Sequence, residues 1–154
     1  DQSTTRYLLS QTKKYLGIEA NTTSTAEKVI SAVGALIGIL LCQIVTLQYF
    51  SPSESLLLIT SMGATATLVF ALPHGALSQP WSVFGGHLIS ALIGILSYQY
   101  IADTLFASAI AVGGAVLIMY FLRCLHPPGG ATALFCVQGG EKVHELGFNF
   151  MVEQ

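Results

Sequence analysis

The stretch VISAVGALIGILLCQIVTLQYF, residues 29–50, contains no charged side chain and decides the fold class. As a helix rising about 1.5 Å per residue, it is about 33 Å long and crosses a hydrocarbon core of about 30 Å. Residues 29–140 carry only three formal charges, Glu54, Asp103 and Arg123, which separate four apolar stretches. The sequence therefore predicts an all-α, polytopic transmembrane helical bundle with four main spans.

The composition supports this fold class and excludes others. Only 9% of the residues are charged and 53% are hydrophobic, whereas a soluble domain keeps about a quarter of its residues charged. The net charge of -2 offers no basic face for nucleic acid. The three cysteines have no CxxC spacing and predict no disulfide framework. We expect an N-terminal cytoplasmic or interfacial segment, residues 1–27, and one transmembrane domain, residues 28–154.

The N-terminal segment is polar and contains no secretory signal, so membrane insertion must use residues 29–50 themselves. Residues 5–16 have helical spacing that fits either a short helix at the lipid headgroups or a plain soluble tail. Ser24 and Glu27 form a predicted capping box, which places the start of the first span near Lys28. Gly34 and Gly38 then form a GxxxG pattern, which arises either from close helix packing or by chance in glycine-rich apolar sequence.

Helix-start signals place the other three spans. Ser51, Pro52 and Glu54 predict a second span over residues 52–72. Its middle is unusually polar and small, so we expect it to face protein or a water-filled cavity. The remaining two spans are residues 81–101, which begin with Trp81 as an interfacial anchor, and residues 104–122, which Asp103 caps. Lysine and arginine precede the first span or follow the fourth, and the positive-inside rule then predicts a cytoplasmic N-terminus.

The pattern changes after Arg123. The sequence LHPPGG, residues 125–130, cannot continue a helix, because proline lacks an amide donor and restricts the residue before it. The apolar run that follows is too short to cross the bilayer. Irregular backbone at membrane depth must be buried in protein or line a water-filled cavity. We therefore predict a re-entrant loop and a short half-helix around residues 126–139.

A four-residue string occurs twice. Gly-Ala-Thr-Ala at residues 63–66 returns at residues 130–133, and Leu-Ile-Gly-Ile-Leu at residues 36–40 returns at residues 92–96 with a different offset. Composition bias explains the second pair easily, whereas a structural repeat and chance both remain open for the first pair. In a repeat of the transporter type, interrupted helices meet near the midplane, and their positive N-termini favour an anion.

The loop before the predicted half-helix has the chemistry of an anion nest. Gly129 and Gly130 let the backbone turn, while the free amides of Ala131 and Thr132 and the Thr132 hydroxyl can donate to an anion. Arg123 either adds a positive charge at the cavity edge or anchors the helix end at the interface. The candidate substrate-binding residues are Ser61, Gly63, Ala64, Thr65, His74, Gln79, His87, Arg123, His126, Gly129, Gly130, Ala131 and Thr132.

The chain has four histidines, of which three fall at or beside span ends and can carry a coupling proton near neutral pH. His87 lies inside a span, where an ionisable side chain indicates function; the alternative for each histidine is a neutral ring that donates to a carbonyl. A metal site of Cys124, His126 and His74 lacks any supporting spacing, and we expect no metal and no cofactor. An enzyme is disfavoured, because the acids within the apolar region are helix caps.

One string identifies a family resemblance. Residues 125–134, LHPPGGATAL, together with the stretches 61–65, 73–81 and 85–87, resemble the HPP family of integral membrane proteins. The resemblance implies a small multi-span protein of a bacterial inner membrane or, alternatively, of a plastid inner envelope. It further implies that some cyanobacterial and plastid relatives carry nitrite, and that many relatives have a further C-terminal span or a soluble regulatory domain, so this chain is expected to be truncated.

Motif chemistry and resemblance together predict a transporter or channel for a small inorganic anion such as nitrite. The anion is expected to bind where interrupted helices begin, between residues 61–65 and the 126–132 loop. The alternative is a membrane assembly or sensor subunit with no transport of its own. In either case the expected partners are the lipid bilayer and further copies of this chain, as a dimer or trimer, because four spans are few for a pore.

Overall fold

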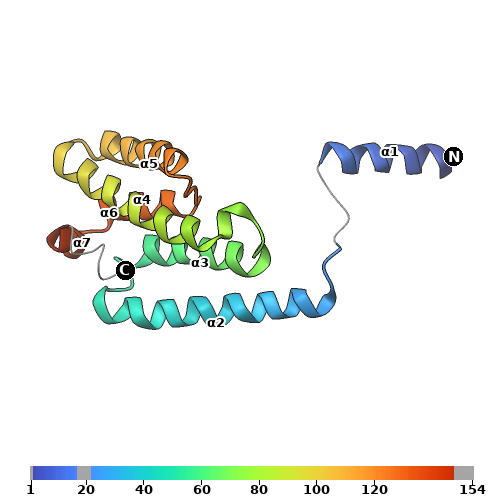
Figure 1. Ribbon diagram of the computed structural model, residues 1–154, viewed down its shortest axis with the longest axis horizontal. Helices are drawn as coiled ribbons and strands as arrows, with labels where there is room; N and C mark the ends of the chain where they lie inside the picture. The colour runs from blue at the N-terminus through green and yellow to red at the C-terminus, as the bar shows by residue number, and fades with distance from the viewer. Residues whose placement is uncertain (1, 17–21, 148–154) are drawn as a thin grey trace.

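The computed structural model describes residues 2–16 and 22–147 of the chain, and all regular secondary structure in these ranges is helical, which confirms the all-α prediction. Figure 1 shows the order of the elements along the chain. They are α1 Gln2–Tyr15, α2 Thr25–Tyr49, α3 Leu56–Ala71, the 3₁₀ turn η1 Ala76–Ser78, α4 Pro80–Tyr100, α5 Thr104–Phe121, α6 Gly129–Gln138 and α7 Glu141–Leu146.

Three of these helices, α2, α4 and α5, are long and apolar enough to cross a membrane. The fourth predicted span corresponds to α3, which is apolar but only 16 residues long, about 24 Å. The described residues therefore support three candidate spans and one shorter apolar helix. Helix α1 stands apart from the bundle (Figure 1) and confirms the predicted helix over residues 5–16.

The predicted capping box starts α2. The Glu27 amide donates to the Ser24 hydroxyl oxygen at 3.2 Å, and the Ser24 amide donates to the Glu27 carboxylate at 2.8 Å. Two amides that helix geometry leaves without partners are thereby satisfied. Helix α2 begins at Thr25, slightly before the expected start near Lys28.

Helix α3 begins later than predicted, at Leu56 and not at Pro52. The amide and hydroxyl of Ser51 both donate to the Glu54 carboxylate, and the Glu54 amide lies against the Ser51 hydroxyl oxygen. These reciprocal bonds close a separate turn ahead of the helix. The predicted bonding between Ser51 and Glu54 is therefore present, but it caps this turn and α3 begins after it. The same bonds hold the pKa of Glu54 below its usual range.

The expected interruption of the second span over residues 61–65 is wrong, because α3 is continuous from Leu56 to Ala71. Its hydroxyl side chains donate back to carbonyls of the preceding turn: Thr60 to Leu56 at 2.8 Å and Thr67 to Gly63 at 3.0 Å. Such local bonds satisfy polar side chains within a helix. A polar, small composition therefore did not require a break.

The GxxxG pattern of α2 packs against α3. A Cβ added to Gly34 would lie 2.5 Å from the Phe70 ring, and one added to Gly38 would lie 3.0 Å from it. The two glycines thus form the surface on which Phe70 of α3 rests. Of the two explanations for the pattern, the structure favours helix packing.

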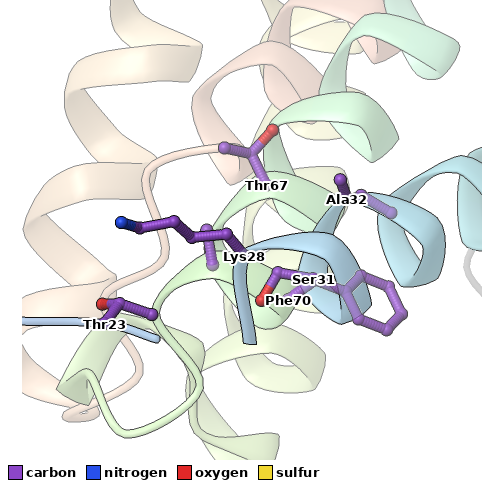
Figure 2. Close-up of a pocket in the computed structure, with 8 residues that line it drawn as sticks. Thr23, Lys28, Ser31, Ala32, Thr67 and Phe70 are labelled. Atoms are coloured by element: carbon purple, nitrogen blue, oxygen red, sulfur yellow. The ribbon is translucent and has the colours of Figure 1, made fainter. Parts of the chain in front are cut away.

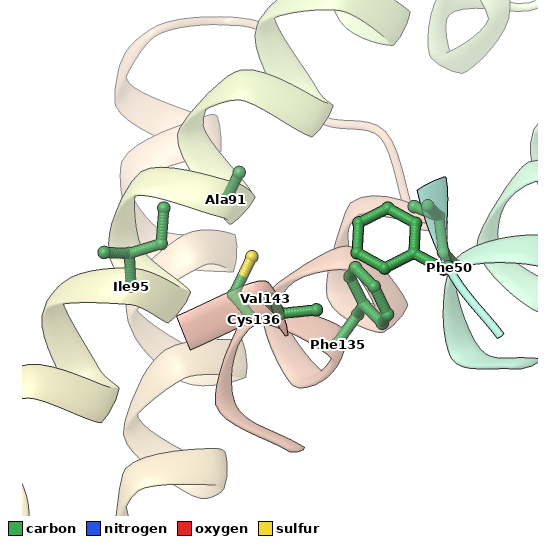
Figure 3. Close-up of a cluster of buried hydrophobic side chains, with 7 residues drawn as sticks. Phe50, Ala91, Ile95, Phe135, Cys136 and Val143 are labelled. Atoms are coloured by element: carbon green, nitrogen blue, oxygen red, sulfur yellow. The ribbon is translucent and has the colours of Figure 1, made fainter. Parts of the chain in front are cut away.

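Helix α6 is the centre of the bundle and contacts α3, α4 and α5. Phe135 of α6 is fully buried and meets Phe50 edge to face, with ring centroids 5.8 Å apart. Figure 3 shows this pair beside Cys136 and Val143, with Ala91 and Ile95 of α4 on the other side. The predicted short helix after the two prolines is confirmed by α6, whereas the re-entrant course of residues 126–139 through the membrane stays a prediction.

Contacts near the helix ends hold α4 and α5 together. The Trp81 indole N–H donates to the Leu122 carbonyl at 3.0 Å, which ties the start of α4 to the end of α5. The Asp103 carboxylate accepts the Phe106 amide at 3.0 Å and caps α5 as predicted. The antiparallel pair formed by α4 and α5 gives α6 a fixed surface to pack on.

Candidate functional site

Five polar side chains from four separate segments meet inside the bundle. Ser61 and Thr65 come from α3, His87 from α4, His126 from the loop before α6, and Thr132 from α6. We call them the His87–His126 cluster. His87 stands seven residues into α4, about 10 Å along the helix axis. All five were among the candidate residues predicted from the sequence, which placed residues 61–65 opposite the 126–132 loop but did not predict the individual side-chain contacts.

His126 is fully buried, and both of its ring nitrogens have partners. Its Nδ1 lies 2.7 Å from the Leu77 carbonyl oxygen, and its Nε2 lies 3.0 Å from the Thr65 hydroxyl oxygen. Because a carbonyl can only accept, Nδ1 of His126 carries a proton. The ring is therefore held in one orientation by η1 on one side and α3 on the other.

His87 faces the same threonine. Its Nε2 lies 2.9 Å from the Thr65 hydroxyl oxygen, and its Nδ1 lies 2.8 Å from the Thr132 hydroxyl oxygen. The centroids of the His87 and His126 rings are 5.0 Å apart, with the rings 65° from parallel. Two positive charges at 5.0 Å would repel by about 3 kcal/mol at an effective dielectric constant near 20. The geometry disfavours protonating both rings at once.

Ser61 closes the cluster on the α6 side. Its hydroxyl donates to the Pro128 carbonyl at 2.7 Å and lies 2.8 Å from the Thr132 hydroxyl. Thr65 and Thr132, the threonines of the two Gly-Ala-Thr-Ala strings, therefore contact the two nitrogens of one ring, His87. The two copies of the string bring their hydroxyl groups to one place, although the first lies in the middle of a helix and the second at the start of one.

Close helix contacts at two glycines make room for the cluster. A Cβ on Gly86 would lie 2.4 Å from the His126 Cβ, and one on Gly129 would lie 2.4 Å from the Ser90 hydroxyl. The sequence reasoning missed Ser90 and the accepting carbonyls of Leu77 and Pro128. The Gly85-Gly86 pair directly before His87 was the available signal, since small residues in a membrane helix mark a close approach.

The predicted free amides at the start of α6 are not free. The Gly129, Gly130 and Ala131 amides donate to the carbonyls of His126, Pro127 and Pro128, respectively. The Thr132 amide also reaches the Pro128 carbonyl, at 3.3 Å. The physical reason is that the two-proline turn winds directly into the helix, so its carbonyls supply the partners that an isolated helix start lacks. The amides that were expected to bind an anion are therefore already bonded to carbonyls of the preceding turn.

Several other predicted site residues lie outside the cluster. His74 and Ala64 are exposed, and Gly63 faces Ile39 of α2. Gln79 is exposed and donates to the Pro73 and Gly75 carbonyls, which fixes the loop before α4.

Two more predicted residues stand near the start of α6 and one at the end of α5. Gly130 and Ala131 are half-buried. Arg123 is exposed and adopts a left-handed backbone, with φ of 55°, directly after α5. The exposed position of Arg123 fits an interfacial anchor, which was one of its two predicted roles.

One pocket borders the cluster. It has a volume of about 460 Å³ and includes His87, the one ionisable side chain among its lining residues, Met62, Val69, Ser78, Pro80, Val83, Phe84, His87 and Leu88. The rest of its wall is mostly apolar. A small solute in this pocket would meet the His87 ring as its main polar contact.

A second pocket lies between the start of α2 and the end of α3. It has a volume of about 360 Å³, and Figure 2 shows Lys28, Ser31 and Phe70 around it. Lys28 is its one charged lining residue. None of the cluster side chains lines this pocket, so it is separate from the site described above.

The described residues contain no group of three or more potential metal ligands. Cys124 is buried beside Gly85, and burial raises the pKa of its thiol. It does not join His126 and His74 in one set, since His74 is exposed on a loop.

The comparisons with known proteins agree with the membrane fold. The model of the HPP transmembrane region matches residues 20–154. A transmembrane protein of Dictyostelium discoideum is 34% identical over 142 residues, covering 88% of this chain and 46% of that protein. A second one from the same organism is 37% identical over 119 residues, covering 74% of this chain and 41% of the relative.

The chain therefore spans less than half the length of these curated relatives. No solved structure gives a significant match. The family model covers most of the chain, and both relatives are transmembrane proteins. This agrees with the three helices of this chain that are long and apolar enough to cross a membrane. This chain is an integral membrane protein and belongs to the HPP family.

Proposed function

We propose that this protein transports a small monovalent anion of the nitrite class across the membrane, with the His87–His126 cluster as its polar site. The observation that carries the proposal is a pair of ionisable rings between helices, the fully buried His126 and the half-buried His87, which lines a pocket of about 460 Å³. Ionisable side chains within membrane helices are rare and mark transport pathways.

The chemistry of the site suits an anion when the histidine pair holds a proton. A bare anion in an apolar pocket loses its hydration, and a nearby positive charge offsets that cost. His87 is the group that can present this charge to the pocket. The site thus differs from the sequence prediction, since the amides of α6 are paired and the positive charge would come from a protonated imidazole.

Transport direction adds an energetic requirement. Moving one negative charge into a compartment that is 100 mV more negative costs about 2.3 kcal/mol. A steep concentration gradient or a coupled cation must supply this free energy. The proposal therefore includes coupling to protons, for which the histidine pair is the available group.

Orientation, location and assembly belong to the same proposal. Lysine and arginine flank the first apolar helix on its N-terminal side, which favours a cytoplasmic N-terminus in a bacterial inner membrane or the equivalent face of a plastid envelope. A dimer or trimer would supply the further helices that a closed pathway needs, because the described residues provide three long apolar helices.

Uptake of nitrite into proteoliposomes tests the proposal, with nitrate and formate as competitors. We expect His87→Gln and His126→Gln each to lower uptake by about tenfold or more, because each removes one of the two rings that can hold the proton and its positive charge. His144→Gln is the matched control, since His144 stacks on Tyr98 outside the cluster. Wild-type protein that reconstitutes well yet moves none of the three anions would contradict the proposal.

A second function has one observation in its favour. In the described residues every buried side-chain polar atom has a hydrogen-bond partner, as expected of a cluster that only stabilises the fold. A membrane assembly or sensor subunit without transport would need no more than this. It predicts that both histidine variants lose thermal stability and that the wild type shows no uptake.

A further inference from the structure

The hydrogen bonds of the His87–His126 cluster can be assigned one donor at a time from its fixed acceptors. The Pro128 carbonyl can only accept, so the single Ser61 hydroxyl proton points to it at 2.7 Å. The 2.8 Å contact of Ser61 with Thr132 then requires Thr132 to donate. Because the only hydroxyl proton of Thr132 is donated to Ser61, Nδ1 of His87 must carry the proton of the 2.8 Å contact between His87 and Thr132.

The same reasoning from the other end fixes His126. The Leu77 carbonyl can only accept, so Nδ1 of His126 is protonated as well. If both rings are neutral, each Nε2 is then a bare acceptor. Both Nε2 atoms lie on the Thr65 hydroxyl oxygen, at 2.9 Å and 3.0 Å, and that hydroxyl has one proton. In a neutral cluster the Thr65 hydroxyl can therefore donate to only one of the two Nε2 atoms, and the other contact has no proton.

One added proton completes the chain in either of two arrangements. When it sits on Nε2 of His87, that nitrogen donates to Thr65, and Thr65 donates to Nε2 of His126. When it sits on Nε2 of His126, both bonds reverse. Thr65 also donates to the Ser61 carbonyl at 3.1 Å, the longest of its three contacts, since a carbonyl bonded within α3 can accept a second bond. In either arrangement the Thr65 proton turns from this carbonyl to the accepting Nε2.

The hydrogen-bond partners of the two rings are neutral groups. Within the described residues these partners are hydroxyls and carbonyls from α3, η1 and α6, and none of them is a carboxylate, lysine or arginine. The Cys124 backbone and side chain face Gly86 and Gly85, with the thiol kept neutral by its raised pKa. The second ring is the main electrostatic neighbour of each ring.

We propose that His87 and His126 form a site for one shared proton, and that the Thr65 hydroxyl relays this proton between their Nε2 atoms. In the transfer, the His87 N–H bond breaks as its proton bonds to the Thr65 oxygen. The original Thr65 O–H bond breaks as that proton bonds to Nε2 of His126. One positive charge moves from the ring that lines the pocket to the fully buried ring, and no atom changes oxidation state.

The relay follows from geometry alone, whereas its use in moving an anion rests on the proposed function. With the charge on His87, the pocket presents a cation to an anion. With the charge on His126, the His87 ring is neutral and the pocket no longer presents a cation to the anion. One proton position would thus alternate the affinity of the pocket.

Nitrogen NMR of the full chain, with ¹⁵N-labelled histidine in lipid nanodiscs and no anion added, tests the relay. Imidazole ¹⁵N shifts report charge and tautomer directly, and His87→Gln and His126→Gln assign the signals. We expect His87 and His126 to titrate together, taking up one proton between them over the accessible pH range. Independent titration with one proton on each ring would overturn the proposal.

Two variants of the bridging residue supply the positioning test. Thr65→Val keeps the shape and removes the hydroxyl, so we expect the proton to stay on one ring, which gives one charged and one neutral ¹⁵N pattern in place of signals averaged over both rings. Thr65→Ser restores the hydroxyl and is expected to restore the averaged signals. A Thr65→Val spectrum equal to the wild type, with the protein folded, would show that the hydroxyl is not the relay. Because this readout needs no transport, a failed uptake assay with a joint titration would reject the anion and keep the relay.

Discussion

The two Gly-Ala-Thr-Ala strings have the same letters and opposite surroundings. Residues 63–66 lie in the middle of a continuous helix, whereas residues 130–133 open a short one. A Cβ added to Gly63 would have one neighbour, the Ile39 side chain at 4.0 Å, and Ala64 is exposed. Thr132 and Ala133, in contrast, are fully buried. Both copies are helical, and they differ in their position within the helix. The preceding residues explain this difference, since two prolines stand directly before the second copy only and no helix continues through them.

The copies nevertheless agree in where their threonines point. Thr65 and Thr132 reach the two nitrogens of His87 from opposite helices. The common element of the two strings is therefore a small, polar helix surface that another helix can approach, with a hydroxyl available to a neighbour. The following predictions separate that shared role from the different packing of the two copies.

Backbone contact at the second copy predicts the largest effect. A Cβ on Gly94 of α4 would lie 2.6 Å from the Ala133 carbonyl and 2.7 Å from the Cys136 Cβ. We expect Gly94→Ala to destabilise the fold by about 1–3 kcal/mol, because helices α4 and α6 must separate. Thermal unfolding followed by Trp81 fluorescence measures it, since the Trp81 indole bonds to Leu122 across the α4–α5 contact.

Two other glycines serve as controls for that variant. Gly113 of α5 has nothing within 4 Å of an added Cβ, and Gly63 of the first copy has one distant contact. Gly113→Ala and Gly63→Ala should leave the midpoint of unfolding unchanged or slightly raised, since alanine favours helix over glycine. Equal effects of the three variants would contradict the idea that only the second copy is tightly packed.

The sequence predicted the helical class, the caps at Ser24 and Asp103 and the short helix after the prolines, because these depend on composition and on neighbours within one turn. It did not predict that α3 is continuous, because hydroxyls that bond within their own helix look the same in sequence as hydroxyls that line a cavity. The amides of α6 were misjudged because their partners are carbonyls of a turn whose geometry no spacing reveals.

For the site, residue types were predictable and contacts were not. His87, His126, Thr65 and Thr132 stood out as polar groups in apolar sequence, and the structure joins them. Arg123, His74 and Gln79 stood out equally and lie outside the cluster. The difference arises from which face of a helix or loop each occupies after packing, and a single sequence contains that information only where the period is regular.

Removing the buried threonine predicts the next largest effect. Thr132→Val leaves the Ser61 oxygen and Nδ1 of His87 without a shared partner in a fully buried place. We expect a loss of about 1–3 kcal/mol in the free energy of unfolding. Thr67→Val, one residue after the first copy, is the control, because Thr67 is exposed and its hydroxyl bonds only within α3. If Thr67→Val proved as costly, burial of Thr132 could not be the cause.

Ser61→Ala sharpens the comparison at a lower cost. Ser61 connects the first copy's helix to the turn before the second copy through the Pro128 carbonyl. Its loss should destabilise the protein by about 1–2 kcal/mol, because the contact of Ser61 with Thr132 is lost together with the bond to Pro128. Thr60→Ala, which removes an exposed hydroxyl bonded to Leu56 of the same helix, should cost less. Denaturation midpoints of the two variants, measured side by side, compare a bond between segments with a bond inside one helix.

The second position of each string predicts the smallest effect. Ala64 is exposed on α3, and Ala131 is half-buried at the start of α6. Ala64→Leu should change stability by no more than about 0.5 kcal/mol, because a leucine there meets lipid and not protein. Ala131→Leu should cost somewhat more, since α6 is enclosed by α3, α4 and α5. A large cost for Ala64→Leu in lipid, with Ala131→Leu neutral, would mean that α3 presents this face to another copy of the chain, and the exposed residues of the first copy would then be an interface.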